Sequence, residues 1–263
     1  MPIEIKVQEA YRKYAREYFQ ARLEGDLRNR VNNFTELPSM LEALGILNQK
    51  KLLDVGCGPG IHAREYARLG ANVTGVDVTS EMIEIAKKYC PTAAFQTANI
   101  YTLPFNDNSF DIVTASLMTF HLDDPARAFK EVKRVLKDNG KFLYSDLSPF
   151  YLARGNDRNL TNIHHALGHS RDKVTGEIQV FSGNFEEDTV DKVPLVSGAD
   201  VKCYRRMFGS NTRIIAQAGL TIVDYINCFP TPEFEKIRPQ AYQILNAMPP
   251  YCIYVTQKKE SIA

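Results

Sequence analysis

The chain has 263 residues, and its 32 lysines and arginines nearly balance its 31 aspartates and glutamates, which gives a formal net charge of +1 at pH 7. This balance argues against a nucleic acid or an anionic membrane surface as the main partner. No apolar run approaches the roughly 20 residues that span a bilayer, and residues 1–18 lack the apolar core of a signal peptide. We therefore expect a cytoplasmic protein that acts as a monomer or a homodimer.

Residues 1–50 show helical spacing of aromatic and apolar side chains, among them Tyr11, Tyr14 and Tyr18. From residue 51 onward, short apolar runs alternate with amphipathic stretches. The expected strands are residues 51–56, 72–78, 93–100, 110–118 and 141–148, and the expected helices between them are residues 60–69, 80–89 and 125–137. Such alternation with short connections predicts an α/β fold with a parallel sheet and helices on both of its faces.

The alternation stops in a polar stretch, residues 148–206, in which residues 176–185 could form a hairpin. A helix at residues 210–219 and strands at 221–229 and 249–258 then follow, and we expect the two strands to pair antiparallel at the sheet edge. This organisation predicts an N-terminal helical lid (1–50), an α/β core (51–147 and 207–263) and an inserted substrate cap (148–206) over the carboxyl edge of the sheet.

The stretch Leu-Leu-Asp-Val-Gly-Cys-Gly-Pro-Gly, residues 52–60, places an acid and three glycines where the first strand ends. Ligands of open parallel sheets bind beyond the carboxyl ends of the strands. Glycines there let the backbone approach a ligand closely, and backbone amides at the helix start face a negative group. Asp77 ends the next strand and can accept both hydroxyls of a ribose. The two features predict an adenosine-containing ligand and are compatible with a nicotinamide-dependent oxidoreductase.

A third stretch, Thr-Ala-Asn-Ile-Tyr-Thr-Leu-Pro-Phe-Asn-Asp-Asn-Ser-Phe-Asp-Ile-Val at residues 97–113, separates these classes. With residues 52–60 and 75–86 it resembles the class I S-adenosylmethionine-dependent methyltransferases, in particular the small-molecule group related to ubiquinone and menaquinone methyltransferases. The resemblance covers roughly residues 52–148. It implies a Rossmann-like, seven-stranded, mainly parallel sheet with an antiparallel last strand, S-adenosyl-L-methionine as methyl donor, and a small-molecule acceptor methylated on oxygen, nitrogen or carbon.

The resemblance also implies which residues contact the donor. These are Asp54, Gly56, Cys57, Gly58 and Gly60 around the methionyl part, Asp77 at the ribose, Val78 and Met82 on the adenine, Asn99 and Ile100 at the adenine edge, and Ser116 and Leu117 near the sulfonium. The family usually has an acid where Asn99 stands, and an amide oxygen can accept the same hydrogen bond.

Candidate catalytic bases for the acceptor are His121, His164, His165 and Asp146, and a packing role is the alternative for His121. Candidate substrate contacts are Tyr14, Tyr18, Met118, Tyr151 and Arg205, with the aromatic N-terminal helix closing the pocket from above. Two functional alternatives remain open. A nicotinamide-dependent oxidoreductase leaves residues 99–110 without a role, and a noncatalytic S-adenosylmethionine-binding protein would keep the glycine loop.

Metal binding is not expected. The five cysteines, at positions 57, 90, 203, 228 and 252, include no Cys-x-x-Cys pair and fit reduced packing residues. His165 and His169 are four residues apart, but no nearby cysteine or carboxylate completes a ligand set.

Overall fold

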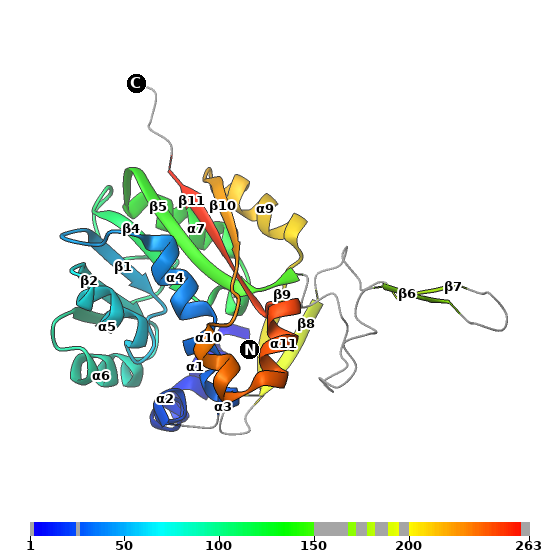
Figure 1. Ribbon diagram of the computed structural model, residues 1–263. Helices are drawn as coiled ribbons and strands as arrows, with labels where there is room; N and C mark the ends of the chain where they lie inside the picture. Colours follow the sequence, from blue (N-terminus) through cyan, green and yellow to red (C-terminus); the bar gives the residue numbers. More distant parts are fainter. Residues whose placement is uncertain are drawn as a thin grey trace.

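A seven-stranded sheet forms the centre of the computed structural model, which describes residues 3–24, 27–149, 168–171, 178–181, 189–194 and 200–258. The strand order is β3–β2–β1–β4–β5–β11–β10 (Figure 1). The strands are β1 (Lys51–Val55), β2 (Asn72–Asp77), β3 (Ala94–Thr97), β4 (Phe110–Ser116), β5 (Leu136–Leu147), β10 (Thr221–Asn227) and β11 (Tyr251–Gln257). Strands β1 to β5 pair in parallel, and β11 is antiparallel to β5 and β10. The predicted mainly parallel sheet with an antiparallel last strand is confirmed.

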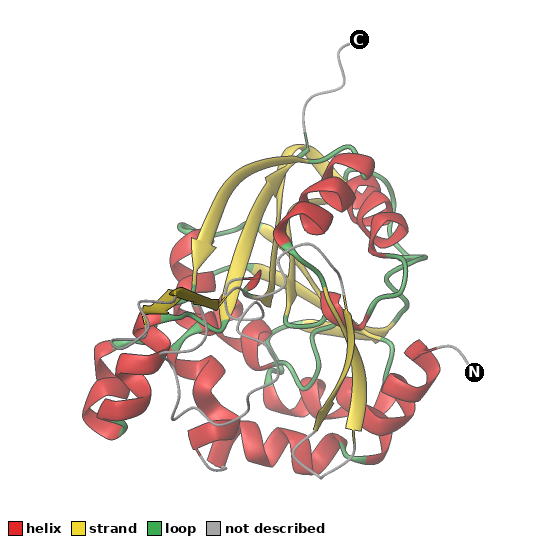
Figure 2. Ribbon diagram, turned by 90° about the vertical axis from the view of Figure 1, so that its right-hand side faces the viewer, coloured by secondary structure: helices red, strands yellow, loops and turns green. Residues whose placement is uncertain are grey.

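Helices cover both faces of this sheet, as predicted (Figures 1 and 2). Four helices precede the sheet: α1 (Ile3–Lys13), α2 (Ala15–Glu24), α3 (Leu27–Phe34) and α4 (Glu36–Leu44). The others are α5 (Ile61–Arg68), α6 (Ser80–Tyr89), the short 3₁₀ helix η1 (Thr119–His121), α7 (Pro125–Val135), α9 (Phe208–Gln217), α10 (Pro232–Ile237) and α11 (Pro239–Ala247). No helix of these described stretches is long and apolar enough to cross a bilayer.

Strand β1 is buried on both of its faces. Leu52 packs in a cluster with Tyr66 of α5, whereas Leu53 packs in a second cluster with Phe129 of α7. Successive side chains of a strand point to opposite faces, so a strand covered on both sides needs an unbroken apolar run. The sequence before Asp54 supplies that run, and the strand end is thereby fixed between two cores.

Two antiparallel pairs lie outside the main sheet. Strand β7 (Ile178–Phe181) pairs with β6 (Gly168–Arg171). Residues 176–185 therefore contribute one strand of this antiparallel pair, and the other strand lies before the predicted hairpin. Strand β8 (Thr189–Pro194) pairs with β9 (Asp200–Arg205), and β9 also contacts α1 and η1. The last strand of the predicted cap therefore reaches the carboxyl edge of the sheet.

Helix α7 ends at Val135, two residues before the predicted end at Lys137. Strand β5 already begins at Leu136, which pairs with Phe110 of β4 before a register shift in the ladder. The Asn139-Gly140 pair lies within this irregular first part of β5 and does not end the helix. The pairing with β4 overrides the local helical pattern.

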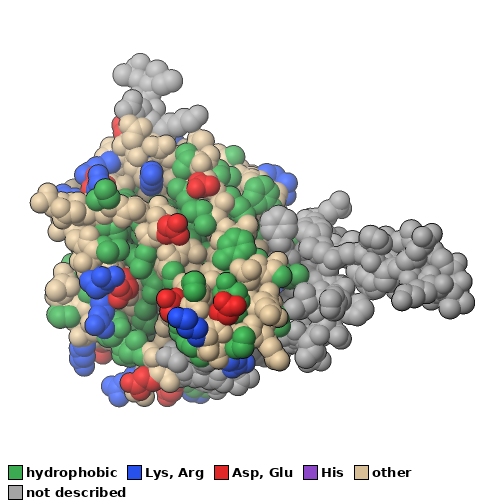
Figure 3. Space-filling model, in the orientation of Figure 1, with side chains coloured by type: hydrophobic (Ala, Val, Ile, Leu, Met, Phe, Trp, Pro, Cys, Tyr) green, Lys and Arg blue, Asp and Glu red, His purple; other side chains and the backbone are tan. Residues whose placement is uncertain are grey.

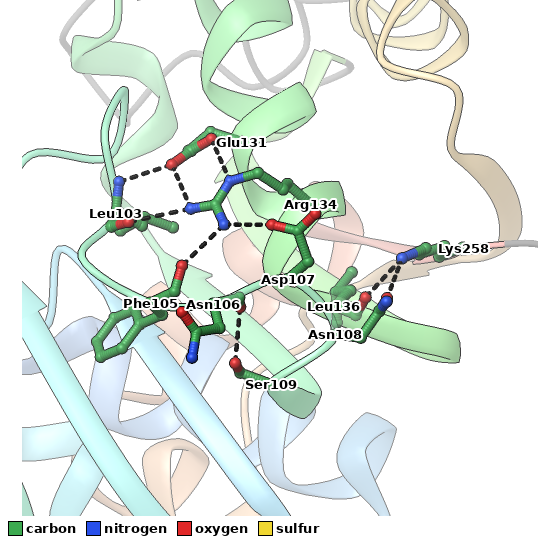
Figure 4. Close-up of polar contacts among 10 residues, drawn as sticks. All are labelled: Leu103, Phe105, Asn106, Asp107, Asn108, Ser109, Glu131, Arg134, Leu136 and Lys258. Carbon is green, nitrogen blue, oxygen red and sulfur yellow. Dashed lines mark hydrogen bonds and ion pairs between the residues drawn. The ribbon is translucent and has the colours of Figure 1, made fainter.

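Arg134 of α7 holds the loop that follows β3 (Figure 4). Its Nη1 donates to the carbonyl oxygen of Phe105 at 2.8 Å and to Asp107 Oδ1 at 2.7 Å, and its Nη2 donates to the carbonyl oxygen of Leu103 at 3.0 Å. Glu131 accepts from the same guanidinium at 2.8 Å and from the Leu103 N–H at 2.8 Å. These charge-assisted hydrogen bonds fix the Leu-Pro-Phe turn between β3 and β4.

Acidic and basic side chains are interspersed with apolar ones on the face shown in Figure 3, in keeping with the near-zero net charge.

Replacing Arg134 by Met should lower the free energy of unfolding by about 2–3 kcal/mol, because two backbone carbonyls and two carboxylates lose a charged donor. Urea denaturation of Arg134→Met and of the exposed-site control Lys130→Met on the same helix measures this. Equal midpoints for the two variants would contradict the assigned role.

Candidate functional site

Two adjoining cavities lie at the carboxyl ends of β1, β2 and β4. The larger has a volume of about 250 Å³ and the smaller about 50 Å³, and they share Tyr18, Gly56, Gly58, Ser116 and Leu117 as lining residues. Most of the residues predicted to contact the donor line one of them. The larger is lined by Gly56, Gly58, Asp77, Val78, Met82, Asn99, Ile100, Ser116 and Leu117, and the smaller additionally by Asp54 and Cys57.

Gly56 and Gly58 have positive φ angles of 66° and 51°, which favour glycine. A Cβ added to Gly56 would lie 2.7 Å from Met118 Cγ, so close packing also requires glycine there. Apart from its chain neighbours, no described residue would lie within 4 Å of a Cβ added to Gly58, and Gly58 lines both cavities. The loop therefore leaves free space beside its backbone, as a close-lying ligand requires.

Gly60 lines neither cavity. A Cβ there would lie 3.1 Å from Ala86 Cβ, and its φ of 83° also favours glycine. Its place fits close packing of the loop against α6, and the predicted direct contact with a ligand is not supported.

Asp77 ties the glycine loop to the start of α6. Its Oδ2 accepts the Gly58 N–H at 2.9 Å, and its Oδ1 accepts the Thr79 N–H at 2.8 Å. Burial raises the pKa of this carboxyl, whereas the two backbone N–H groups oppose that rise. Each carboxylate oxygen keeps further acceptor capacity toward the larger cavity, which suits a pair of hydroxyls.

Asp54 lines the smaller cavity and has one carboxylate oxygen without a partner in the described part of the chain. Its Oδ1 accepts from Thr114 Oγ1 at 3.0 Å, but its Oδ2 is buried without a hydrogen-bond partner among the described residues. Burial raises the pKa of Asp54 to about 6, although His62 and the bond from Thr114 act in the opposite direction. A buried acceptor without a partner is costly, so this oxygen fits a ligand that brings a cationic donor.

Less polar side chains line the larger cavity on the side where the resemblance places the adenine. Met82 is 2% exposed and lines the larger cavity with Val78 and Ile100. Asn99 Oδ1 accepts the Tyr101 N–H at 3.0 Å, which fixes the orientation of this amide. The same oxygen has a second lone pair toward which an amino group could donate.

A buried network lies beneath the cavities. Glu36 of α4 accepts from His62 Nε2 at 2.7 Å and from Ser145 Oγ at 2.7 Å, and Ser145 Oγ accepts the Leu117 N–H at 2.9 Å. Burial opposes ionisation of Glu36, but His62 and these hydrogen bonds lower its pKa. Leu117 has a φ of +52°, an unusual conformation for a side-chain-bearing residue. The network therefore holds a strained turn at the end of β4.

His121 is held between two groups at the edge of the larger cavity. Its Nδ1 lies 3.2 Å from the carbonyl oxygen of Lys202, and its Nε2 lies 3.3 Å from Tyr11 Oη. Because a carbonyl only accepts, Nδ1 carries the proton and Nε2 accepts from the phenol. Burial lowers the pKa of His121 to about 4, so the imidazole is neutral. Tyr11 and Tyr18 meet edge-to-face with ring centroids 5.5 Å apart and both line the cavity.

Several predicted residues lie elsewhere. Tyr14 falls at the break between α1 and α2, outside the lining of either cavity, with Lys13 over its ring. Asp146 is buried behind Thr119, from whose Oγ1 it accepts at 3.1 Å, so its predicted role as a base is not supported. Arg205 lines neither cavity. Tyr151, His164 and His165 lie outside the described residues. Within the described ranges, no cluster of three or more His, Cys, Asp or Glu side chains could hold a metal ion.

Sequence reasoning missed Arg22, Glu36 and His62. Arg22 and His62 line the smaller cavity, and Glu36 lies below it. His62 directly follows the glycine loop, and this position in the sequence is a signal that could have identified it as a site residue. Arg22 and Glu36 carry no local signal, because charged residues are ordinary in helices of this kind.

Asp54→Asn should stabilise the protein at neutral pH. A protein with an acid whose pKa is raised in the folded state loses stability as the pH rises from the pKa of the unfolded state to that of the folded state. For Asp54 this range runs from about 4 to about 6. The free energy of unfolding of the variant should exceed that of the native protein by up to about 3 kcal/mol at pH 7. This difference should shrink toward pH 4. Urea denaturation at both pH values measures it; a difference that does not change with pH would contradict the environment assigned to Asp54.

Comparisons with known proteins bear on what this site does. Residues 53–144 match the sequence model of a family described as a methyltransferase domain. An uncharacterized methyltransferase of Bacillus subtilis is 34% identical over 116 residues, which cover 42% of this chain and 46% of that protein. The demethylmenaquinone methyltransferase of Renibacterium salmoninarum is 33% identical over 109 residues, 41% of this chain and 46% of that protein. The match thus spans just under half the length of these curated relatives.

The fold likeness extends beyond the matched segment. A crystal structure of an S-adenosylmethionine-dependent methyltransferase from Mesorhizobium loti has a TM-score of 0.64 at 22% identity, and the match covers 85% of this chain and 96% of that one. The antiparallel strand β11 between β5 and β10 differs from the order of six strands typical of dinucleotide-binding folds, so the nicotinamide alternative loses its support. Residues 53–144 thus match a methyltransferase domain, and the fold around them is that of solved S-adenosylmethionine-dependent methyltransferases.

Proposed function

We propose that the protein transfers the methyl group of S-adenosyl-L-methionine to a small-molecule acceptor. The observation that carries this proposal is the pair of strand-terminal acids in two joined cavities. Asp77 lines the larger cavity and keeps acceptor capacity, and Asp54, one oxygen of which has no partner among the described residues, lines the smaller. Ribose hydroxyls at Asp77 and an ammonium group at Asp54 satisfy both, and the glycine loop leaves the space between them open.

The residues around the end of β4 then position the reaction. Bound S-adenosyl-L-methionine supplies an electrophilic methyl group on its sulfonium sulfur. Ser116, Leu117 and Met118 line the cavity where that group would lie, and the bond from the Leu117 N–H to Ser145 keeps their turn fixed. Displacement at a methyl group depends on alignment and on exclusion of water, so the chain contributes mainly by holding the reactants in line.

The acceptor would occupy the aromatic part of the larger cavity. Tyr11, Tyr18, Met118 and Leu122 provide an apolar wall, and His121 adds one nitrogen that accepts a hydrogen bond. This surface suits a small, largely apolar acceptor whose nucleophilic atom carries a proton, which could replace Tyr11 at His121 Nε2. The name of the Renibacterium relative specifies demethylmenaquinone, a small molecule, which supports the same class.

Binding of S-adenosylhomocysteine, measured by calorimetry, tests the donor site. The intact protein should bind it in the micromolar range, and Asp77→Ala should weaken binding at least about 10-fold because charge-assisted hydrogen bonds to the ribose are lost. Asp77→Asn keeps an acceptor oxygen in a side chain of the same shape, so it should weaken binding of S-adenosylhomocysteine by a smaller factor. Glu84→Ala, at an exposed position on the following helix, serves as the matched control.

Thermal melting of each variant without ligand shows whether it is folded. No binding to the intact protein, or unchanged binding to a folded Asp77→Ala variant, would overturn the proposed donor site.

A further inference from the structure

Glu36 of α4 is a fully buried carboxylate that lies outside the lining of both cavities. Each of its oxygens accepts one hydrogen bond, Oε2 from His62 Nε2 and Oε1 from Ser145 Oγ, both at 2.7 Å. Hydrogen bonds to an ionised acceptor are among the stronger ones. A buried charge is nonetheless a poor means of stabilising a fold, because apolar side chains of similar volume often do as well or better. Its role is therefore to be sought in how it places its neighbours.

Ser145 connects Glu36 to the turn at the end of β4. The Ser145 hydroxyl donates its hydrogen to Glu36, which leaves the lone pairs of its oxygen to accept the Leu117 N–H at 2.9 Å. Hydrogen bonds that follow one another in this way polarise and strengthen each other. Glu36 thus fixes the direction of the Ser145 hydroxyl and makes its oxygen a better acceptor.

Leu117 depends on such a contact. Its φ of +52° lies in the left-handed region, which a residue with a side chain adopts only at an energetic cost and keeps only where its surroundings hold it. Ser116 and Leu117 line both cavities, so this turn forms the wall where the cavities meet. The turn also packs on the glycine loop, since a Cβ at Gly56 would lie 2.7 Å from Met118 Cγ. A displaced turn would change the shape of the site at its centre.

We propose that Glu36 is a positioning residue for methyl transfer. Acting through Ser145, it holds the Leu117 turn in the conformation against which the sulfur and the methyl group of the donor lie. This inference rests on the proposed function, since it concerns the same donor. Helix α4, which contributes no lining residue to the two cavities, then helps to align the reacting methyl group.

The nucleoside end of the site is held by other contacts. Asp77 accepts the N–H groups of Gly58 and Thr79. If Glu36 only stabilised the fold, its loss would weaken every ligand of the site alike. If it positions the turn, its loss should weaken ligands that reach past the ribose and spare those that end there.

Two ligands separate these roles in calorimetric titrations of the full chain. S-adenosylhomocysteine reaches past the ribose to the turn, whereas adenosine ends at the ribose. Ser145→Ala removes the acceptor of the Leu117 N–H, so it should weaken binding of S-adenosylhomocysteine about 10-fold and change binding of adenosine less than about 2-fold. Glu36→Gln keeps the shape of the side chain but offers one acceptor oxygen to two donors, so it should weaken S-adenosylhomocysteine selectively as well.

A double variant tests whether Glu36 acts through Ser145. In the Ser145→Ala background, Glu36→Gln should weaken S-adenosylhomocysteine by a much smaller factor than it does in the native background. The matched control is Thr256→Val, which removes a fully buried hydroxyl that donates to the carbonyl oxygen of Phe142 at 2.9 Å. Thr256 lines neither cavity, so this variant should melt at a lower temperature and keep both affinities.

Glu36→Asp, whose carboxylate is one methylene shorter, takes the place of Glu36→Gln if that variant does not fold. Equal weakening of both ligands, unchanged binding of S-adenosylhomocysteine to the folded variants, or additive effects of the two substitutions would overturn the positioning role. The donor site would stand in each of these cases. If the native protein does not bind S-adenosylhomocysteine, the proposed function itself is wrong.

Discussion

The buried carboxylate of Glu36 joins the N-terminal helices to the edge of the sheet on which the candidate site is built. It accepts hydrogen bonds from His62 at the start of α5 and from Ser145 of β5, and Ser145 in turn accepts from Leu117. Three elements far apart in the sequence therefore meet at one carboxylate. Removing one partner of a buried charge typically costs about 3–5 kcal/mol, so the geometry of the turn after β4 depends on this contact.

Asp54 and Asp77 are further carboxyls in a desolvated environment, and both line the candidate site. Asp54 is buried and Asp77 is half-buried, and in both cases desolvation raises the pKa of the carboxyl. Asp77 is partly satisfied by two backbone N–H groups, whereas one oxygen of Asp54 has no partner among the described residues. The protein thus keeps polar groups in an unfavourable environment and in fixed orientations, which is how a site is preorganised for a charged ligand.

Local sequence patterns predicted the parts of the molecule that depend on neighbouring residues. The glycine loop and Asp77 follow from strand ends and turn chemistry, and the parallel sheet with helices on both faces follows from the alternation of strands and helices. The end of α7 was misplaced because pairing of Leu136 with β4 decides it. Asp146 was expected at the site, but it faces Thr119, since strand residues alternate in direction and the sequence does not state which face is open.

Arg22 and Glu36 mark the limit of such prediction. Each lies in a helix with ordinary composition, and its burial results only from how the N-terminal helices pack on the sheet. No spacing rule distinguishes a buried helical arginine from a solvated one. Their importance appears when the cavity, the unpartnered atoms and the charges are considered together.

A crystal structure of the protein with S-adenosylhomocysteine tests the account most directly. The ribose hydroxyls should lie within hydrogen-bond distance of the Asp77 carboxylate, with the adenine beside Met82 and the sulfur near Leu117. Ligand density at another place, or an orientation that leaves Asp77 without a ligand contact, would contradict the assignment of these cavities to the methyl donor.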